Sequence, residues 1–322
     1  MDFNDIIGHN RAIDALKTSI QNDSISHSYL FQGEEGIGKK MVAYAFSKTL
    51  LCKEQGQEPC NICSSCKKFD SGNHPDFFFI QPERGQIRVD EIDGLIEEIA
   101  TFPFESKRKI FVIDDSHLMN LTSKNKLLKT LEEPPKYVNI ILISSNPDSL
   151  LPTITSRVQR LKFHPADIHR VSELLVDRYD ISQDKADFIG GFTNGSIGKA
   201  VKLSMDDGFD SRRDELMKII ESLVSGDRTK AFSAMDFFNK NKENIDEILD
   251  LMLYWFRDIV IYKEMGESSL IVNRDKLENL SIQSHMEFRK INDIIEKIDE
   301  TRFNIKRNIN YQLSIETMLL NI

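Results

Sequence analysis

The sequence has no long apolar run, no cysteine outside one short segment and no excess of positive charge. No segment approaches the ~20 consecutive apolar residues of a membrane-spanning helix, and the first residues lack the basic and apolar regions of a signal peptide. We therefore expect a cytoplasmic protein without a membrane partner. The net charge of -9 excludes a chain that binds nucleic acid over its whole surface, because such binding needs lysine and arginine against phosphates. Any contact with DNA should be local or shared with partners.

Length and composition indicate a folded protein of several domains. The chain has 322 residues, of which 40% are hydrophobic and 29% charged, and at roughly 100–200 residues per domain it should form two or three domains. Strand patterns alternate with helical patterns up to residue 165, and only helical patterns follow. We expect an α/β domain over residues 1–165, a small helical domain over residues 166–207 and an all-helical domain over residues 208–322.

The α/β region should contain a mainly parallel sheet with helices on both faces. Continuous apolar runs, of the kind that strands buried on both faces show, alternate there with apolar residues at helical spacing. The expected strands lie at residues 27–31, 77–80, 109–115, 139–146 and 158–163. In such a sheet the ligand crevice lies at the carboxyl ends of the strands, where the sequence places Asp114, Asp115 and Asn146.

A glycine-rich segment follows the first expected strand and precedes a helical pattern. It nearly matches the phosphate-loop pattern G-x-x-x-x-G-K-[ST], in which backbone N–H groups surround phosphate oxygens, a lysine reaches the outer phosphates and a hydroxyl ligates Mg²⁺. Gly33, Gly38 and Lys39 fit, and Gly36 lies between them, but Lys40 stands where the hydroxyl should be. The segment predicts either a weakened nucleotide site or a turn that has kept only the shape of the loop.

Two acids end the strand expected at residues 109–115. Phosphate-loop ATPases place one acid there to hold Mg²⁺ through water and another to orient the attacking water. Asp114 and Asp115 stand at these places, although Asp115 is one methylene shorter than the usual Glu. The alternative interpretation is a pair of solvated turn acids that cap a helix beginning at Ser116.

All four cysteines lie in one short insert, residues 52–66, with the spacing C-x7-C-x2-C-x2-C. Their thiolates suit one tetrahedral Zn²⁺ and would close its coordination shell, which predicts a structural zinc ion. The predicted ligands are Cys52, Cys60, Cys63 and Cys66. Free buried thiols and a redox C-x-x-C pair are the alternatives. A further hypothesis gives the insert a role in binding DNA or a partner, which its mixture of lysines and acids does not favour.

Seven segments together resemble the bacterial clamp-loader branch of the AAA+ ATPases. They are Ile6–His9, Gly33–Lys40, the four-cysteine insert, Ile113–Met119, Leu127–Pro135, Ser145–Pro147 and Thr155–Arg157. The resemblance implies an AAA+ module, made of the α/β domain and a three-helix lid, followed by an all-helical collar domain that joins a hetero-oligomer. It also implies a role within DNA polymerase III, in loading the sliding clamp onto primed DNA during replication.

The same resemblance assigns roles to single residues. Arg157 would be an arginine finger that acts in trans on ATP bound to a neighbouring gamma or tau subunit, and Asn146 would sense the γ-phosphate. The delta subunit would be another partner, with the sliding clamp and primer-template DNA reached through the complex.

Three features of active relatives are altered in this sequence. They are the Mg²⁺-binding hydroxyl at Lys40, the longer acid at Asp115 and the lid arginine at Gly198. Three such losses predict little or no ATP hydrolysis by the chain itself. They argue against ATP, ADP or Mg²⁺ as cofactors and leave nucleotide binding without hydrolysis open. The alternative is a self-sufficient gamma-type AAA+ ATPase.

Overall fold

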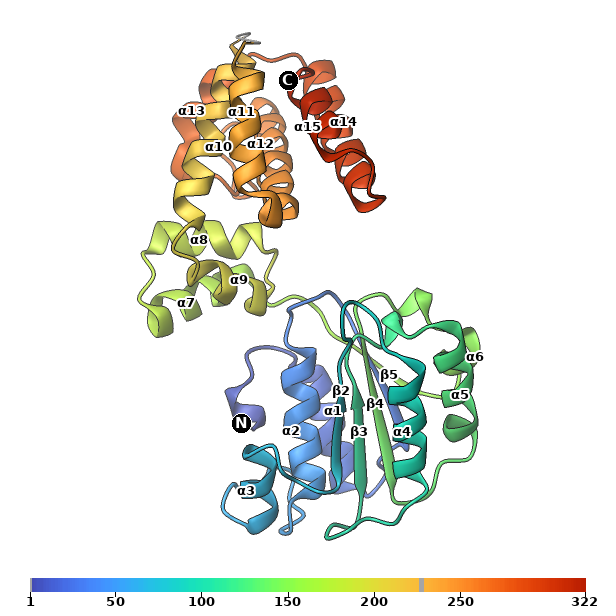
Figure 1. Cartoon of the computed structure of the whole chain (residues 1–322). Coiled ribbons are helices and arrows are strands. Elements are labelled where there is room, and N and C mark those ends of the chain that lie inside the picture. The colour runs from blue at the N-terminus through green and yellow to red at the C-terminus, as the bar shows by residue number, and fades with distance from the viewer. Residues whose placement is uncertain (1, 226–228) are drawn as a thin grey trace. The chain divides into compact units, whose positions relative to one another are not determined.

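The computed structural model describes residues 2–225 and 229–322, which form two compact units (Figure 1). The first unit contains the residues up to Asp167 together with Gly195–Lys199, and the second contains Ile168–Asn194 and Ala200–Ile322. The short segment Gly195–Lys199 therefore belongs with the α/β region, although its neighbours in sequence do not. The three-domain division at residues 165 and 207 stays a prediction.

The first unit is built on a five-stranded sheet. Its strands are β1 (Ser28–Gln32), β2 (Phe77–Ile80), β3 (Lys109–Ile113), β4 (Val138–Ser144) and β5 (Gln159–Lys162). They lie in the order β2-β3-β4-β1-β5, and every pair of neighbours is parallel. All five strands expected from the apolar runs are present. The predicted fold class, a parallel sheet with helices on both faces followed by a helical region, is confirmed.

Helices cover both faces of this sheet, and each face has its own core. One core joins the sheet to α1 (Asn10–Gln21) and α2 (Lys39–Leu51), and the other joins it to α4 (Val89–Ile99), α5 (Leu121–Glu132) and α6 (Pro152–Thr155). Successive side chains of a strand point to opposite faces, so Tyr29 and Phe31 enter the first core and Leu30 enters the second. Figure 1 shows α2 and α4 on opposite sides of the strands.

The carboxyl ends of three neighbouring strands lie at one edge of the sheet, as expected. Gln32 at the end of β1 pairs with Ser144 at the end of β4, and Ile113 at the end of β3 pairs with Leu142. The two strands expected to reach residues 115 and 146 both end two residues earlier. The left-handed backbone of Asp115, with φ of 44°, is incompatible with an extended strand at that position. The acids therefore lie in the turn after β3.

The second unit is helical throughout its described residues, which are joined by turns and loops. They are α7 (Ile168–Tyr179), α8 (Gln183–Phe192), α10 (Phe209–Val224), α11 (Thr229–Lys240), α12 (Ile245–Met265), α13 (Leu277–Gln283), α14 (Phe288–Lys306) and α15 (Tyr311–Leu319). The helix α9 (Ile197–Ser204) begins in the first unit and continues into the second. Trp255 of α12 is buried, and its Nε1–H donates to Gln283 Oε1 at 2.9 Å. Among the described residues, no helix has both the length and the apolar character needed to cross a bilayer.

Candidate functional site

The glycine-rich loop joins β1 to α2, and its glycines adopt backbone shapes that other residues rarely take. Gly33, Gly36 and Gly38 have φ of 155°, 77° and 107°. A Cβ at Gly33 would lie 2.5 Å from the carbonyl oxygen of Phe163, and one at Gly36 would lie 2.6 Å from Ser196 Oγ. The sequence prediction of a strand, a tight loop and a helix at this place is therefore confirmed by the local structure.

Five consecutive carbonyl oxygens of this loop accept hydrogen bonds from donors of the chain itself. Lys39 Nζ donates to the first two, and donors from the N-terminal segment and from the start of α9 reach the other three. Gly33 O and Glu34 O accept from Lys39 Nζ at 2.6 and 2.5 Å. Glu35 O accepts from Ser196 Oγ at 3.0 Å, Gly36 O from the N–H of Gly198 at 2.8 Å, and Ile37 O is bonded to His9 Nε2 at 2.6 Å. The chain's own hydrogen bonds therefore fix the shape of the loop.

Lys39 is the one buried cation of the loop, with 6% of its surface exposed. Burial lowers the pKa of its ammonium group, and the charges of Asp115 and Asp114 act in the opposite direction. The structure thus brings together the lysine and the two acids that the sequence pattern predicted, and Lys39 occupies the position that reaches phosphate in a working loop.

Lys40 pairs directly with one of these acids. Its Nζ lies 3.3 Å from Asp114 Oδ2 and 4.2 Å from the centre of the Phe79 ring. Asp114 stands where a phosphate-loop ATPase holds Mg²⁺ through water. The ammonium group of Lys40 therefore neutralises the carboxylate that would otherwise help to hold the metal.

Asp115 lies beside Asp114 and does not cap the following short helix. Its backbone N–H donates to Asp114 Oδ1 at 3.1 Å, and its own side chain makes no capping hydrogen bond. Burial and the neighbouring charge of Asp114 raise the pKa of the Asp115 carboxyl. Its Oδ1 lies 3.9 Å from Nδ1 of His117. The interpretation of Asp115 as a helix-capping acid therefore has no support in the structure.

Asn146 lies at the same edge of the sheet, just after β4, and is exposed. Its backbone N–H donates to Ser144 Oγ at 3.2 Å, and its carbonyl oxygen accepts from Ser149 Oγ at 2.9 Å. These bonds hold the turn in one shape. The sensor role of Asn146 stays a prediction.

The start of α9 packs directly on the glycine-rich loop. Gly198 donates its N–H to Gly36 O, and a Cβ at Gly198 would lie 2.8 Å from that oxygen and 3.3 Å from Gly36 Cα. Contacts this short require that residue 198 has no side chain unless the backbone moves. An arginine at this position would need a different separation of the two segments.

Arg157 lies at the amino ends of the strands, and the loop lies at their carboxyl ends. Its carbonyl oxygen accepts a hydrogen bond from the hydroxyl of Ser28, the first residue of β1, at 3.0 Å. The glycine-rich loop follows the other end of this five-residue strand, which is about 16 Å away at ~3.3 Å per residue. The guanidinium group bonds to Glu132 and to α6 rather than to any group of the loop. The structure therefore does not bring Arg157 to its own loop.

The four cysteines come together as the spacing predicted. Cys52 follows α2, and Cys63 and Cys66 lie at the start of α3 (Ser64–Asp70). The four Sγ atoms lie within 4.8 Å of one another, close to the ~3.8 Å separation that Zn–S bonds of about 2.3 Å give in a tetrahedron. Backbone N–H groups of Cys60, Cys63 and Cys66 each donate to a cysteine sulfur at 3.4 Å. The donor set fits one metal ion.

The pKa values of these thiols differ because their surroundings differ. Burial raises the pKa of Cys52 and of Cys66. For Cys63 burial acts in the same direction, but hydrogen bonds from the backbone N–H groups of Cys66 and Lys53 outweigh it and lower the pKa to about 6. A thiolate is thus favoured at the start of α3, where the helix dipole also stabilises negative charge.

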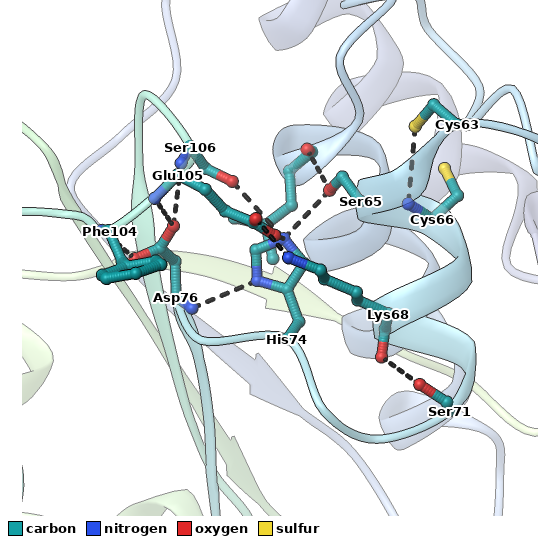
Figure 2. Close-up of polar contacts among 11 residues, drawn as sticks. Cys63, Ser65, Cys66, Lys68, Ser71, His74, Asp76, Phe104, Glu105 and Ser106 are labelled. Carbon is teal, nitrogen blue, oxygen red and sulfur yellow. Dashed lines mark hydrogen bonds and ion pairs between the residues drawn. The ribbon is translucent and has the colours of Figure 1, made fainter.

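A buried polar network ties the cysteine segment to the sheet unit (Figure 2). The backbone N–H of Asp76 donates to His74 Nδ1 at 3.1 Å, so His74 Nε2 carries the proton and donates to Ser65 Oγ at 2.9 Å. The Ser65 hydroxyl donates in turn to Leu51 O at 2.6 Å. Ser65 and Leu51 are each next to a cysteine in sequence, so the network fixes two of the predicted metal ligands relative to the sheet.

The opposite end of this network holds the loop that precedes β3. The Asp76 carboxylate is fully buried and accepts the backbone N–H groups of Phe104, Glu105 and Ser106 at 2.5, 3.0 and 2.8 Å (Figure 2). Burial lowers the pKa of His74, and the charges of Glu105 and Asp76 oppose that shift. The cysteine segment and the sheet are therefore parts of one hydrogen-bonded structure.

Comparison with known proteins assigns the chain to a family. The family model described as the delta subunit of DNA polymerase III matches residues 8–167, and the model for its C-terminal part matches residues 207–322. The DNA polymerase III subunit delta' of Bacillus subtilis (strain 168) is 32% identical over 316 residues, which are 96% of this chain and 94% of that protein. The chain belongs to the delta' family of DNA polymerase III subunits.

Relatives outside the delta' family are also similar to the chain. The tau subunit of DNA polymerase III from the same Bacillus strain is 28% identical, over 81% of this chain and 50% of tau. Among solved structures, a gamma subunit-related protein of Thermotoga maritima covers 95% of this chain and 97% of that chain, with 20% identity and a TM-score of 0.47.

Three residues of this delta' family member reach the site region without having been assigned a role from the sequence. His9 and Ser196 hold carbonyl oxygens of the loop, and Glu132 pairs with Arg157. His9 and Glu132 lie within segments that carried the family resemblance, and Ser196 lies outside them. Their contacts join positions far apart in sequence, so spacing alone gave no signal for them.

The close approach of Gly198 to Gly36 predicts the effect of one methyl group. Gly198→Ala should lower the free energy of unfolding by about 1–3 kcal/mol, because the added Cβ overpacks the contact. Gly94→Ala is the matched control: Gly94 lies in α4, a Cβ there would have no neighbour within 4 Å, and stability should rise by about 0.5–1 kcal/mol. Denaturant unfolding measures both. Equal effects of the two substitutions would contradict the tight contact.

Proposed function

We propose that this chain is a clamp-loader subunit that supplies Arg157 to ATP bound on a neighbouring gamma or tau subunit and does not hydrolyse ATP itself. The observation that carries the proposal is the position of Arg157, at the end of the strands opposite its own loop. In this proposal, a guanidinium group at that end of the strands acts on a nucleotide held by another subunit. There it would neutralise charge on the transferred phosphoryl group.

The ion pair between Lys40 and Asp114 supports the second half of the proposal. Lys40 replaces the hydroxyl that ligates Mg²⁺. Its ammonium group also forms an ion pair with Asp114, the acid that would hold the metal through water. One substitution thus weakens two contacts to the same ion. The proposal concerns hydrolysis, which requires the metal, and leaves nucleotide binding without hydrolysis open.

The family to which the chain belongs supports a proposal for its assembly. We infer that gamma or tau and delta subunits are its direct partners, and that the complex brings it to the sliding clamp and primer-template DNA. In this proposal residues 1–165 and the lid, residues 166–207, form the AAA+ module. Residues 208–322 form the collar through which the subunits assemble.

We further propose that Cys52, Cys60, Cys63 and Cys66 hold one structural Zn²⁺. Thiolates are soft ligands that suit zinc, and four of them leave no open position for a substrate or an activated water. The N–H···S bonds and the anchoring of α3 through Ser65 support a rigid site. When bound, the ion would cross-link the end of α2 to the start of α3.

The arginine finger is tested in the assembled complex. Arg157→Ala should depress clamp- and DNA-stimulated ATP turnover, because the site that Arg157 faces would lose a cation worth about 10³-fold or more in rate. Arg160→Ala, a nearby exposed arginine of β5, is the control and should leave turnover unchanged. Normal activity of the Arg157→Ala complex would overturn the proposal.

The state of the glycine-rich loop is tested on the isolated chain. The wild type should show negligible ATP hydrolysis and no Mg²⁺-dependent gain in nucleotide binding, while Lys40→Thr should gain Mg²⁺-dependent binding because it frees Asp114 and restores the hydroxyl. Titration with labelled ATP, with and without Mg²⁺, measures this. Robust wild-type turnover that Lys39→Ala abolishes would instead favour a self-sufficient gamma-type ATPase.

The zinc site is tested by metal content and thermal unfolding. The purified chain should hold one zinc ion, and Cys63→Ser should lose it and lower Tm, by about 2–4 °C for each kcal/mol of lost stability in a domain of this size. Ser71→Ala, in the exposed residue after α3, should change neither quantity. A chain that contains no zinc and whose Tm does not respond to chelator would refute the site.

A further inference from the structure

The side chain of Arg157 is held in one orientation by its own unit. One terminal nitrogen, NH2, lies 2.9 Å from Glu132 Oε1. The other, NH1, donates to Thr153 O at 2.9 Å and to Ser156 Oγ at 3.3 Å. About 36% of the side-chain surface remains exposed, so part of the side chain is accessible from outside the unit.

The backbone that carries Arg157 is also fixed. Its N–H donates to Ile154 O at 3.0 Å, and its carbonyl oxygen accepts from Ser28, a fully buried residue at the start of β1. Ile154 is buried in the core beneath α6. With the backbone held by these hydrogen bonds, the direction of the side chain depends on the groups that bind its far end.

Glu132 is well suited to set that direction. It is the last residue of α5, whose Leu127 and Leu131 are buried against the sheet, and the residues after it are Glu133 and two prolines. The helix therefore ends rigidly at Glu132. The negative end of its dipole adds to the attraction that the carboxylate exerts on a nearby cation. Thr153 and Ser156, in contrast, offer only uncharged acceptors.

We propose that Glu132 is a positioning residue that holds Arg157 ready for the phosphate of a nucleotide on the neighbouring subunit. The inference rests on the proposed function of Arg157. Glu132 acts through the arginine and does not itself contact nucleotide. A guanidinium group ordered before the partner arrives loses less conformational freedom at the moment of catalysis, so the contribution belongs to turnover rather than to ATP binding.

The test compares two adjacent glutamates in the complex assembled with partner subunits, clamp and primed DNA. Glu132→Gln keeps the shape of the side chain and removes its charge, and should lower kcat for ATP by about 2- to 10-fold with KM unchanged. Glu133→Gln is the control, because Glu133 is exposed and the described contacts of Arg157 do not include it. Both variants should match the wild type in Tm and in assembly.

A double variant separates this inference from the proposed function. In an Arg157→Ala complex, Glu132→Gln should have no further effect on kcat, since the group it positions is gone. If Arg157→Ala lowers turnover but Glu132→Gln leaves kcat unchanged or raises it, the positioning role is wrong and the arginine finger survives. If Arg157→Ala itself has no effect, the proposed function fails first.

Discussion

The parallel pairing of β1 with β4 and β5 is the constraint on which the rest of the first unit depends. It places the glycine-rich loop and Asn146 at one edge of the sheet. The hydroxyl of Ser28, at the start of β1, holds Arg157 at the opposite end of the strands. A loop that resembles a nucleotide site and an arginine that resembles a catalytic finger are therefore separated by the length of one strand. In this structure the described contacts of the Arg157 guanidinium group do not include the loop.

Much of the fold could be predicted from the sequence because it is encoded locally. Continuous apolar runs identified Phe77–Ile80 and Lys109–Ile113 as strands, glycines identified the loop, and the cysteine spacing identified a cluster whose sulfurs do converge. The contacts of Gly198 with Gly36 and of Glu132 with Arg157 could not be predicted in this way. They join residues far apart in sequence, and their partners are selected by how whole helices pack on the sheet.

The contacts of the glycine-rich loop support its proposed role as a structural element. Its carbonyl oxygens are occupied by His9, Lys39, Ser196 and the backbone of Gly198, so its shape needs no ligand. The ammonium group of Lys40 meets the carboxylate that would assist a metal. We therefore propose that the chain keeps the architecture of a nucleotide site and contributes to hydrolysis only across an interface.

The most direct measurement of this division of roles is a structure of the assembled complex with a non-hydrolysable ATP analogue and Mg²⁺. We predict the analogue and Mg²⁺ in a gamma or tau subunit, with the guanidinium group of Arg157 at hydrogen-bonding distance, about 3 Å, from a phosphate oxygen. We also predict that Lys40 stays paired with Asp114. Mg²⁺-nucleotide bound between Gly33 and Lys40, or Arg157 remote from every phosphate, would contradict the proposed role.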